Sequence, residues 1–351
     1  MKNNMLQEPI TLSQARSLIK AMGHKESILL LSAPGVGKTD SVYQIAEEMN
    51  YMCNSLLGTQ LAPEDVVGIP KIEGQRSVFY PPRVILPEKL PEDKDGFMLF
   101  LDEFPAAHPD IQKAFYSILL ERRIGEYPLP DGAIVVAAGN RPQDNAFVRA
   151  LSSALINRVF ILHVRVDLKE WVDWAEKEKI RSEIIAFIRL FPKSLMREVP
   201  SEPIPFSTPR AWASLSKALD LAEKSNLINN KNDKAIRRAL AFGRLSADDA
   251  QIFTCMEKEL KDLLHPNVYI KDPGRFPKNP TAQWFIISQI RGLVETDMLI
   301  DVTTDELGIF FSTIPNEFKM ALVQGLTEKW GELGADDILY EKVLKEIVKG
   351  L

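Results

Sequence analysis

Residues 32–39 read SAPGVGKT, a run of small residues that ends in Lys38 and Thr39. An apolar run precedes this segment and a helical pattern follows it. In a loop of this kind the backbone N–H groups surround phosphate oxygens, and the start of the next helix adds partial positive charge. The lysine reaches the β and γ phosphates, and the threonine hydroxyl ligates Mg²⁺. The residues expected around the phosphates are Ala33, Pro34, Gly35, Val36, Gly37, Lys38, Thr39 and Asp40.

One position departs from the usual GxxxxGK[ST] pattern, because Ser32 stands where the first glycine is expected. That position closes the preceding strand and does not contact phosphate. We therefore expect nucleotide binding to survive the difference.

A second candidate segment is FMLFLDEF, residues 97–104, in which an apolar run ends in two carboxylates. Asp102 is expected near the Mg²⁺ and holds it largely through water, since Mg²⁺ gives up its waters reluctantly. Glu103 is expected to orient and deprotonate the attacking water. An apolar run followed by Asp-Glu is often only a strand end, but its combination with the phosphate loop favours a hydrolytic role.

The third candidate is Asn140, which ends the apolar run VVAAGN. Asparagine at a strand end is often a turn residue. Here it follows the strand after Asp102, where a neutral amide can hydrogen-bond the attacking water or a γ-phosphate oxygen without competing for the metal. We interpret Asn140 as part of the same site.

These residues need a sheet that brings several strand ends together. Strands are expected at 28–31, 52–57, 97–101, 133–138 and 159–164, and helices at 11–22, 38–50, 109–121 and 152–157. Their alternation predicts an α/β fold with a mostly parallel sheet flanked by helices on both faces. Residues 61–91 are rich in Pro and Gly and are expected to form loops with a small hairpin near 78–80. From residue 168 onward the patterns are helical. We expect a nucleotide-binding domain at 1–167, a helical lid at 168–260 and a helical C-terminal extension at 261–351.

The ordered set of SAPGVGKT, FMLFLDEF, AAGN, LINR and STPR resembles the MoxR group of AAA+ ATPases. The segment LAPEDVVGIP, residues 61–70, is similar to the motif that this group carries before its helix-2 insert. The resemblance covers roughly residues 10–220. It implies a P-loop AAA+ core with an all-α lid and an ATPase that uses ATP and Mg²⁺.

The resemblance also implies two catalytic arginines. Arg158 in LINR corresponds to the arginine that acts on the nucleotide of a neighbouring subunit, where a guanidinium stabilises charge in the transition state. Arg149 is the alternative for this role, with a charge on a helix surface as its simpler explanation. Arg210 in STPR resembles the sensor-2 arginine, which reaches the γ phosphate from the start of a lid helix. An arginine in its first turn can also be merely solvated.

The expected partners follow from the same resemblance. An arginine supplied to a neighbour requires a homo-oligomeric ring, and members of the group generally form hexamers. They often act with a protein that carries a von Willebrand factor A domain. We therefore expect a chaperone-like ATPase that remodels or activates a protein partner.

Composition limits the alternatives. The chain has 351 residues, 45% of them hydrophobic and 26% charged, with a formal net charge of -5. The acidic balance makes nucleic acid an unlikely partner, although a nucleic-acid-acting AAA+ motor or loader stays the alternative function. A nucleotide-gated scaffold and a metabolic P-loop kinase fit the site less well. The four histidines are not spaced as metal ligands, so we expect no metal beyond Mg²⁺. No apolar run is long enough to span a bilayer, so we expect no membrane insertion. No signal peptide is visible, and we expect a cytoplasmic protein.

Overall fold

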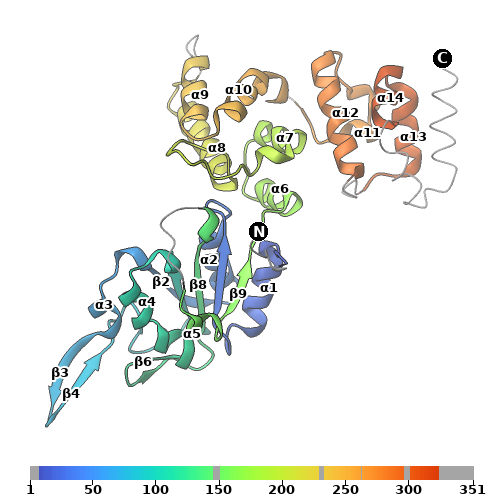
Figure 1. Ribbon diagram of the computed structural model, residues 1–351. Coiled ribbons are helices and arrows are strands. Elements are labelled where there is room, and N and C mark those ends of the chain that lie inside the picture. Colours follow the sequence, from blue (N-terminus) through green and yellow to red (C-terminus); the bar gives the residue numbers. More distant parts are fainter. Residues whose placement is uncertain (1–7, 145–150, 229–232, 262, 296–300, 324–351) are drawn as a thin grey trace, which may run out of the picture. The chain divides into compact units, whose positions relative to one another are not determined.

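A computed structural model describes residues 8–144, 151–228, 233–261, 263–295 and 301–323 (Figure 1). The chain divides into two compact units. The first contains the chain up to Glu170 together with two short later segments, Glu198–Glu202 and Thr208–Arg210. The second contains the remaining residues, and each unit is described by itself below. The domain limits expected from the sequence, at 167/168 and 260/261, stay predictions.

The first unit is built on a five-stranded sheet with the order β2-β5-β8-β1-β9. Its strands are β1 Ile28–Ser32, β2 Tyr51–Leu57, β5 Gly96–Asp102, β8 Ile134–Asn140 and β9 Phe160–His163. Every neighbouring pair is parallel. Three of the strands, β1, β5 and β8, are almost continuously buried and apolar, as strands covered on both faces must be. The predicted parallel α/β core is confirmed.

Helices cover both faces of this sheet. On one face, α2 (Lys38–Glu48) places Tyr43 against Phe100 of β5, with ring centroids 6.3 Å apart. The helix α1 (Leu12–Met22) lies beside α2, and Arg16 of α1 forms an ion pair with Glu48 of α2. On the other face, α4 (Pro109–Ala114) and the helical turns that follow it pack on the sheet.

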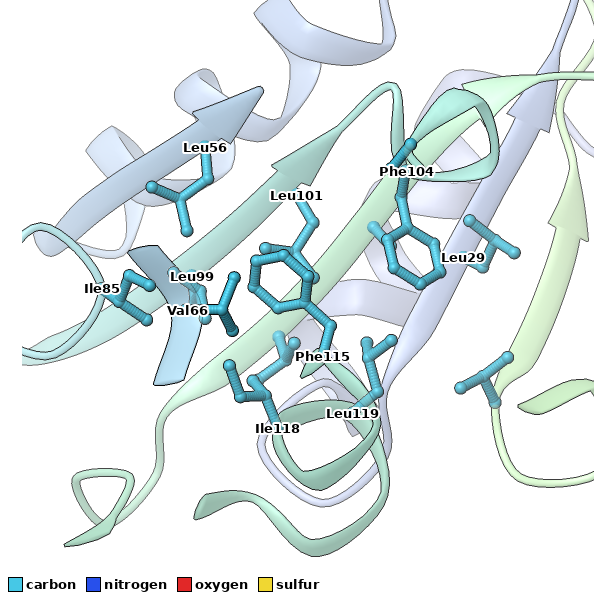
Figure 2. Packing of buried hydrophobic residues seen from close by; sticks show 14 of the residues in the cluster. Leu29, Leu56, Val66, Ile85, Leu99, Leu101, Phe104, Phe115, Ile118 and Leu119 are labelled. Atoms are coloured by element: carbon cyan, nitrogen blue, oxygen red, sulfur yellow. The ribbon is translucent and has the colours of Figure 1, made fainter. Parts of the chain in front are cut away.

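The hydrophobic core on this second face is shown in Figure 2. Phe115, Ile118 and Leu119 come from the segment after α4 and meet Leu99 and Leu101 of β5. All five side chains are at most 4% exposed. Because successive strand residues point to opposite faces, Leu99 and Leu101 belong to this core while Phe100 belongs to the other.

Several local features differ from the sequence expectation. The helix expected at 109–121 ends its regular part at Ala114 and continues as a wider π-helical turn over Ser117–Glu121. Ile118 and Leu119 of this turn are both buried in the core on the second face of the sheet. A short hairpin, β6 Arg123–Ile124 with β7 Tyr127–Pro128, follows and was not predicted.

The predicted hairpin near residues 78–80 is confirmed. It consists of β3 Ile69–Glu73 and β4 Arg76–Tyr80, and it extends away from the sheet of the first unit (Figure 1). Gly74 forms the turn with φ +63°, a conformation that favours glycine. The short helix α3 (Pro63–Val67), which was not predicted, leads into it.

The second unit is helical in its described residues, as expected. Its helices are α7 Ser182–Leu190, α8 Pro209–Lys224, α9 Asp233–Phe242, α10 Ala247–Lys261, α11 Pro266–Lys271, α12 Pro280–Glu295, α13 Thr304–Thr313 and α14 Asn316–Val323. The helix α6 (Leu168–Lys177) contains the boundary between the units. Phe187, Trp212 and Phe253 pack their rings together in the core of the second unit. None of the helices in the described parts of the chain has the length and apolar character that crossing a membrane requires.

Candidate nucleotide site

The carboxyl ends of three neighbouring strands meet at one edge of the sheet. Ser32, the last residue of β1, is in register with Asn140, the last residue of β8. Asp102 ends β5, which pairs with β8 on its other side. In open parallel sheets this edge is where ligands bind. The structure therefore brings together the three strand ends that the sequence singled out.

The loop between β1 and α2 has the backbone of a phosphate cradle. Gly35 and Gly37 have φ values of +79° and +104°, which residues with side chains rarely adopt. A Cβ atom on Gly35 would lie 2.5 Å from Thr208 Oγ1, so a side chain has no room there. Gly37 precedes α2, and no side chain caps this helix start. Backbone N–H groups at the start of α2 are thus left for an anion.

Lys38 is buried beneath this loop. Its Nζ donates hydrogen bonds to Ser32 Oγ at 2.7 Å and to Asn140 Oδ1 at 3.4 Å. Burial lowers the pKa of Lys38 to about 8, the charge of Asp102 opposes this effect, and Arg210 adds to it. The ammonium group is therefore mostly charged at neutral pH and held at the strand ends.

The hydroxyl of Ser32 has a contact that sequence reasoning missed. We expected Ser32 only to close β1, yet its side chain is fully buried and accepts the hydrogen bond from Lys38. It also donates to the carbonyl of Ala33 at 2.8 Å. The sequence did show that a serine replaces the usual first glycine of the phosphate-loop motif. The motif did not indicate that the serine hydroxyl would contact Lys38.

Thr39 and Asp102 form the candidate metal pair. Thr39 Oγ1 donates to Asp102 Oδ2 at 2.7 Å, and Asp102 Oδ1 accepts from the backbone N–H of Glu103 at 2.9 Å. The described residues contain no group of three or more His, Cys, Asp or Glu side chains suited to a metal. Two oxygen donors beside a phosphate cradle fit Mg²⁺, which keeps several waters and shares phosphate oxygens as ligands.

Glu103 lies directly after β5 in a left-handed conformation, with φ +53° and an exposed side chain. Its Oε2 accepts a hydrogen bond of 3.0 Å from Thr59 Oγ1. Thr59 belongs to the short turn Gly58–Gln60 that follows β2, the neighbour of β5 in the sheet. No sequence motif indicated Thr59, so its contact with the candidate base is new information from the structure.

Arg210 lies at this same site. Its backbone N–H donates to the carbonyl of Gly35 at 3.0 Å, and its charge acts on Lys38. Arg210 is exposed in the first turn of α8 and belongs with Thr208 to the first unit. The structure therefore places Arg210 next to the phosphate loop.

Arg158 does not join the other candidate residues. It lies between α5 (Ser153–Ile156) and β9, two residues before Phe160. Phe160 is in register with Ile28, the first residue of β1, whereas the candidate site is at Ser32, the last. That separation is about 13 Å along the strand, so the exposed Arg158 lies toward the opposite edge of the sheet. The alternative, Arg149, falls outside the described residues.

Residues 27–159, which contain four of the five strands of the sheet and most of the site, match the family described as "AAA domain (dynein-related subfamily)". This part of the chain is therefore similar to AAA domains. A segment of 184 residues is 29% identical to Midasin of Giardia intestinalis, covering 50% of this chain and only 4% of that protein. The chain thus spans a small fraction of the length of the relative it matches.

Solved structures of Thermotoga maritima RuvB, each carrying a point mutation, are also similar. One matches with a TM-score of 0.40 and 18% identity, covering 77% of this chain and 76% of that chain. Another matches with a TM-score of 0.36 and 16% identity, covering 84% and 85%. Structural similarity at these TM-scores and sequence identities does not assign an activity to this chain.

Proposed function

We propose that this chain is a Mg²⁺-dependent ATPase of the MoxR-like AAA+ type that hydrolyses ATP at the subunit interfaces of a ring. The observation that carries the proposal is the meeting of Lys38, the Thr39–Asp102 pair and Asn140 at one sheet edge, with Glu103 beside them. A phosphate loop alone would support binding only. A carboxylate beyond the metal pair supplies the base that hydrolysis requires.

Each side chain has a separate task in the proposed reaction. The loop N–H groups and Lys38 bind the β and γ phosphates, while Asn140 orients the attacking water. Glu103 accepts the proton of that water. Thr39 and Asp102 would hold Mg²⁺, which when bound would neutralise phosphate charge. We assign Arg210, in the first turn of α8, to the γ phosphate.

The ring is supported by the position of Arg158. This arginine lies toward the sheet edge opposite its own nucleotide site, so we assign it to the site of a neighbouring subunit. Ile156 and Phe160, on either side of it, are 47% and 49% exposed. Apolar side chains clustered around an exposed arginine are typical of a protein interface. We propose a hexameric ring on the resemblance to the MoxR group.

A protein partner is supported by the hairpin β3–β4. Ile69 and Ile72 are 76% and 81% exposed, and Phe79 is 43% exposed. Exposed apolar residues on an extended arm favour contact with another protein over contact with nucleic acid. We propose that the ATPase remodels or activates such a partner, with a von Willebrand factor A domain protein as the first candidate.

Phosphate release from ATP tests the activity. The wild-type chain is expected to release phosphate with Mg²⁺ and to lose this activity with a chelator, while Lys38→Met is expected to lose ATP binding. Binding without release would instead indicate a nucleotide-gated scaffold. Strong stimulation by DNA or RNA that falls steeply with salt would indicate a nucleic-acid motor and contradict the proposal.

Thr59→Val is expected to raise basal ATP turnover about two- to five-fold, because it frees Glu103 from an exposed hydrogen bond worth about 0.5–1 kcal/mol. Thr59→Ser keeps the hydroxyl and is expected to behave as the wild type. Steady-state turnover of the three proteins is the measurement. A loss of turnover in Thr59→Val would show that Thr59 holds Glu103 in its reactive position.

A further inference from the structure

A fully buried carboxylate in the second unit accepts hydrogen bonds from the hydroxyl groups of three serines. Asp249 in α10 accepts hydrogen bonds from Ser194 Oγ at 2.7 Å, Ser207 Oγ at 2.6 Å and Ser246 Oγ at 2.8 Å. Arg197 binds both of its oxygens, at 2.5 and 2.9 Å. Burial raises the pKa of Asp249, but Arg197 and the three hydroxyls outweigh it and hold the pKa below its ordinary value. The carboxylate therefore stays ionised and fully bonded.

Ser207 makes further hydrogen bonds within the second unit. Besides its bond to Asp249, its carbonyl accepts from the backbone N–H of Arg197 at 2.9 Å, and its Oγ accepts from the backbone N–H of Ser246 at 3.3 Å. The side chain of Ser207 is fully buried. Moving Ser207 away from α10 would leave buried polar groups without partners, which is costly. Ser207 is therefore expected to follow α10.

The next three residues belong to the first unit. The chain passes from the second unit to the first between Ser207 and Thr208, and it returns to the second unit between Arg210 and Ala211. The side chain of Thr208 packs on Gly35, and the backbone N–H of Arg210 donates to the carbonyl of Gly35 at 3.0 Å. One peptide bond thus joins a residue fixed to α10 with residues fixed to the phosphate loop.

This connection is short and stiff. Pro209 has a fixed φ, and a residue that precedes proline, here Thr208, is restricted to extended conformations. Only these two restricted residues separate Ser207 from Arg210 in the chain.

We propose that Asp249 is a positioning residue for Arg210, acting through its bond to Ser207. The bond sets the start of α8 and so the direction in which the Arg210 guanidinium leaves the chain. The inference rests on the proposed function, because it assigns Arg210 to the γ phosphate. A movement of α10 would then change the contact of Arg210 with ATP but not with ADP.

Two matched serine variants test this proposal. Ser207→Ala and Ser194→Ala each remove one hydroxyl donor from Asp249, but only Ser207 adjoins Thr208–Arg210. We expect Ser207→Ala to lower kcat about ten-fold and to reduce the preference for ATP over ADP, with Ser194→Ala within about two-fold of wild type. Ser207→Cys keeps a weak donor and is expected to lie between wild type and Ser207→Ala.

A double-mutant cycle with Arg210→Ala distinguishes an effect of Ser207 on the position of Arg210 from a general destabilisation of the second unit. If Ser207 acts through Arg210, Ser207→Ala lowers turnover no further in the Arg210→Ala background. The proposal would be overturned if Ser207→Ala and Ser194→Ala lowered turnover equally. It would also be overturned if Ser207→Ala lowered turnover further in the Arg210→Ala background.

The same four proteins of the cycle are compared for their ratio of ATP to ADP affinity by calorimetry. Absence of turnover in the wild type would refute the proposed function, and the affinity ratio would still decide the inference. An Arg210→Ala variant that changes neither turnover nor the affinity ratio overturns the inference.

Discussion

Replacing Glu103 with glutamine is expected to lower ATP turnover by about 10²- to 10⁴-fold while ATP binding is retained. The amide has nearly the size and shape of the carboxylate but cannot accept the proton of the attacking water. The groups that bind phosphate lie elsewhere, in the loop and at Lys38, and keep their contacts. Turnover from phosphate release and the ATP dissociation constant from calorimetry are the two measurements.

Two further variants make this result specific. Lys38→Met is expected to lose binding and turnover together, because it removes the buried ammonium group. Asp102→Asn retains the hydrogen-bond partner of Thr39 but weakens the metal pair, so its turnover should respond to the Mg²⁺ concentration. Unchanged turnover in Glu103→Gln would remove Glu103 from the role of base.

The Glu103→Gln protein also serves to find the partner. An ATP-bound ring that does not turn over should hold its protein substrate longer than the wild type does. Ile72→Ser on the hairpin β3–β4, combined with Glu103→Gln, is the matched control for the captured protein.

The central sheet and the meeting of the strand ends could be predicted from the sequence. Apolar runs that alternate with helical patterns indicate buried parallel strands, and polar residues at their carboxyl ends must then share one edge. The positions of Asp102 and Asn140 follow from this rule, and that of Lys38 follows from the phosphate-loop motif between β1 and α2.

The contacts that were missed depend on distances that no local pattern encodes. Thr59 reaches Glu103 from a turn after a neighbouring strand, and Ser32 reaches Lys38 by the geometry of the loop between them. The π-helical turn over Ser117–Glu121 lies where the apolar pattern indicates a regular helix, and its residues Ile118 and Leu119 are buried in the core. Tertiary packing determines such features, and local sequence preference does not.

Replacing Arg158 with alanine is expected to lower turnover by about 10³- to 10⁵-fold, an effect as large as that of an arginine finger. The residue lies toward the edge of the sheet opposite its own phosphate loop, so we assign this loss to the site of the neighbouring subunit. Arg123→Ala removes another exposed arginine of the first unit and is expected to keep wild-type turnover. Steady-state turnover of the two variants, each checked for ring size in solution, is the measurement.

Mixing subunits then distinguishes a role in the neighbouring site from a structural one. Arg158→Ala subunits keep a complete phosphate loop, and Lys38→Met subunits keep Arg158. In a mixed ring, an interface at which a Lys38→Met subunit supplies Arg158 to the phosphate loop of an Arg158→Ala subunit has a complete site. Two inactive proteins are therefore expected to regain turnover when they are mixed. Recovery requires an arginine that crosses the interface, because a residue needed only for folding of its own subunit would stay defective. If no mixing ratio restores activity although mixed rings form, Arg158 does not act on the neighbouring site.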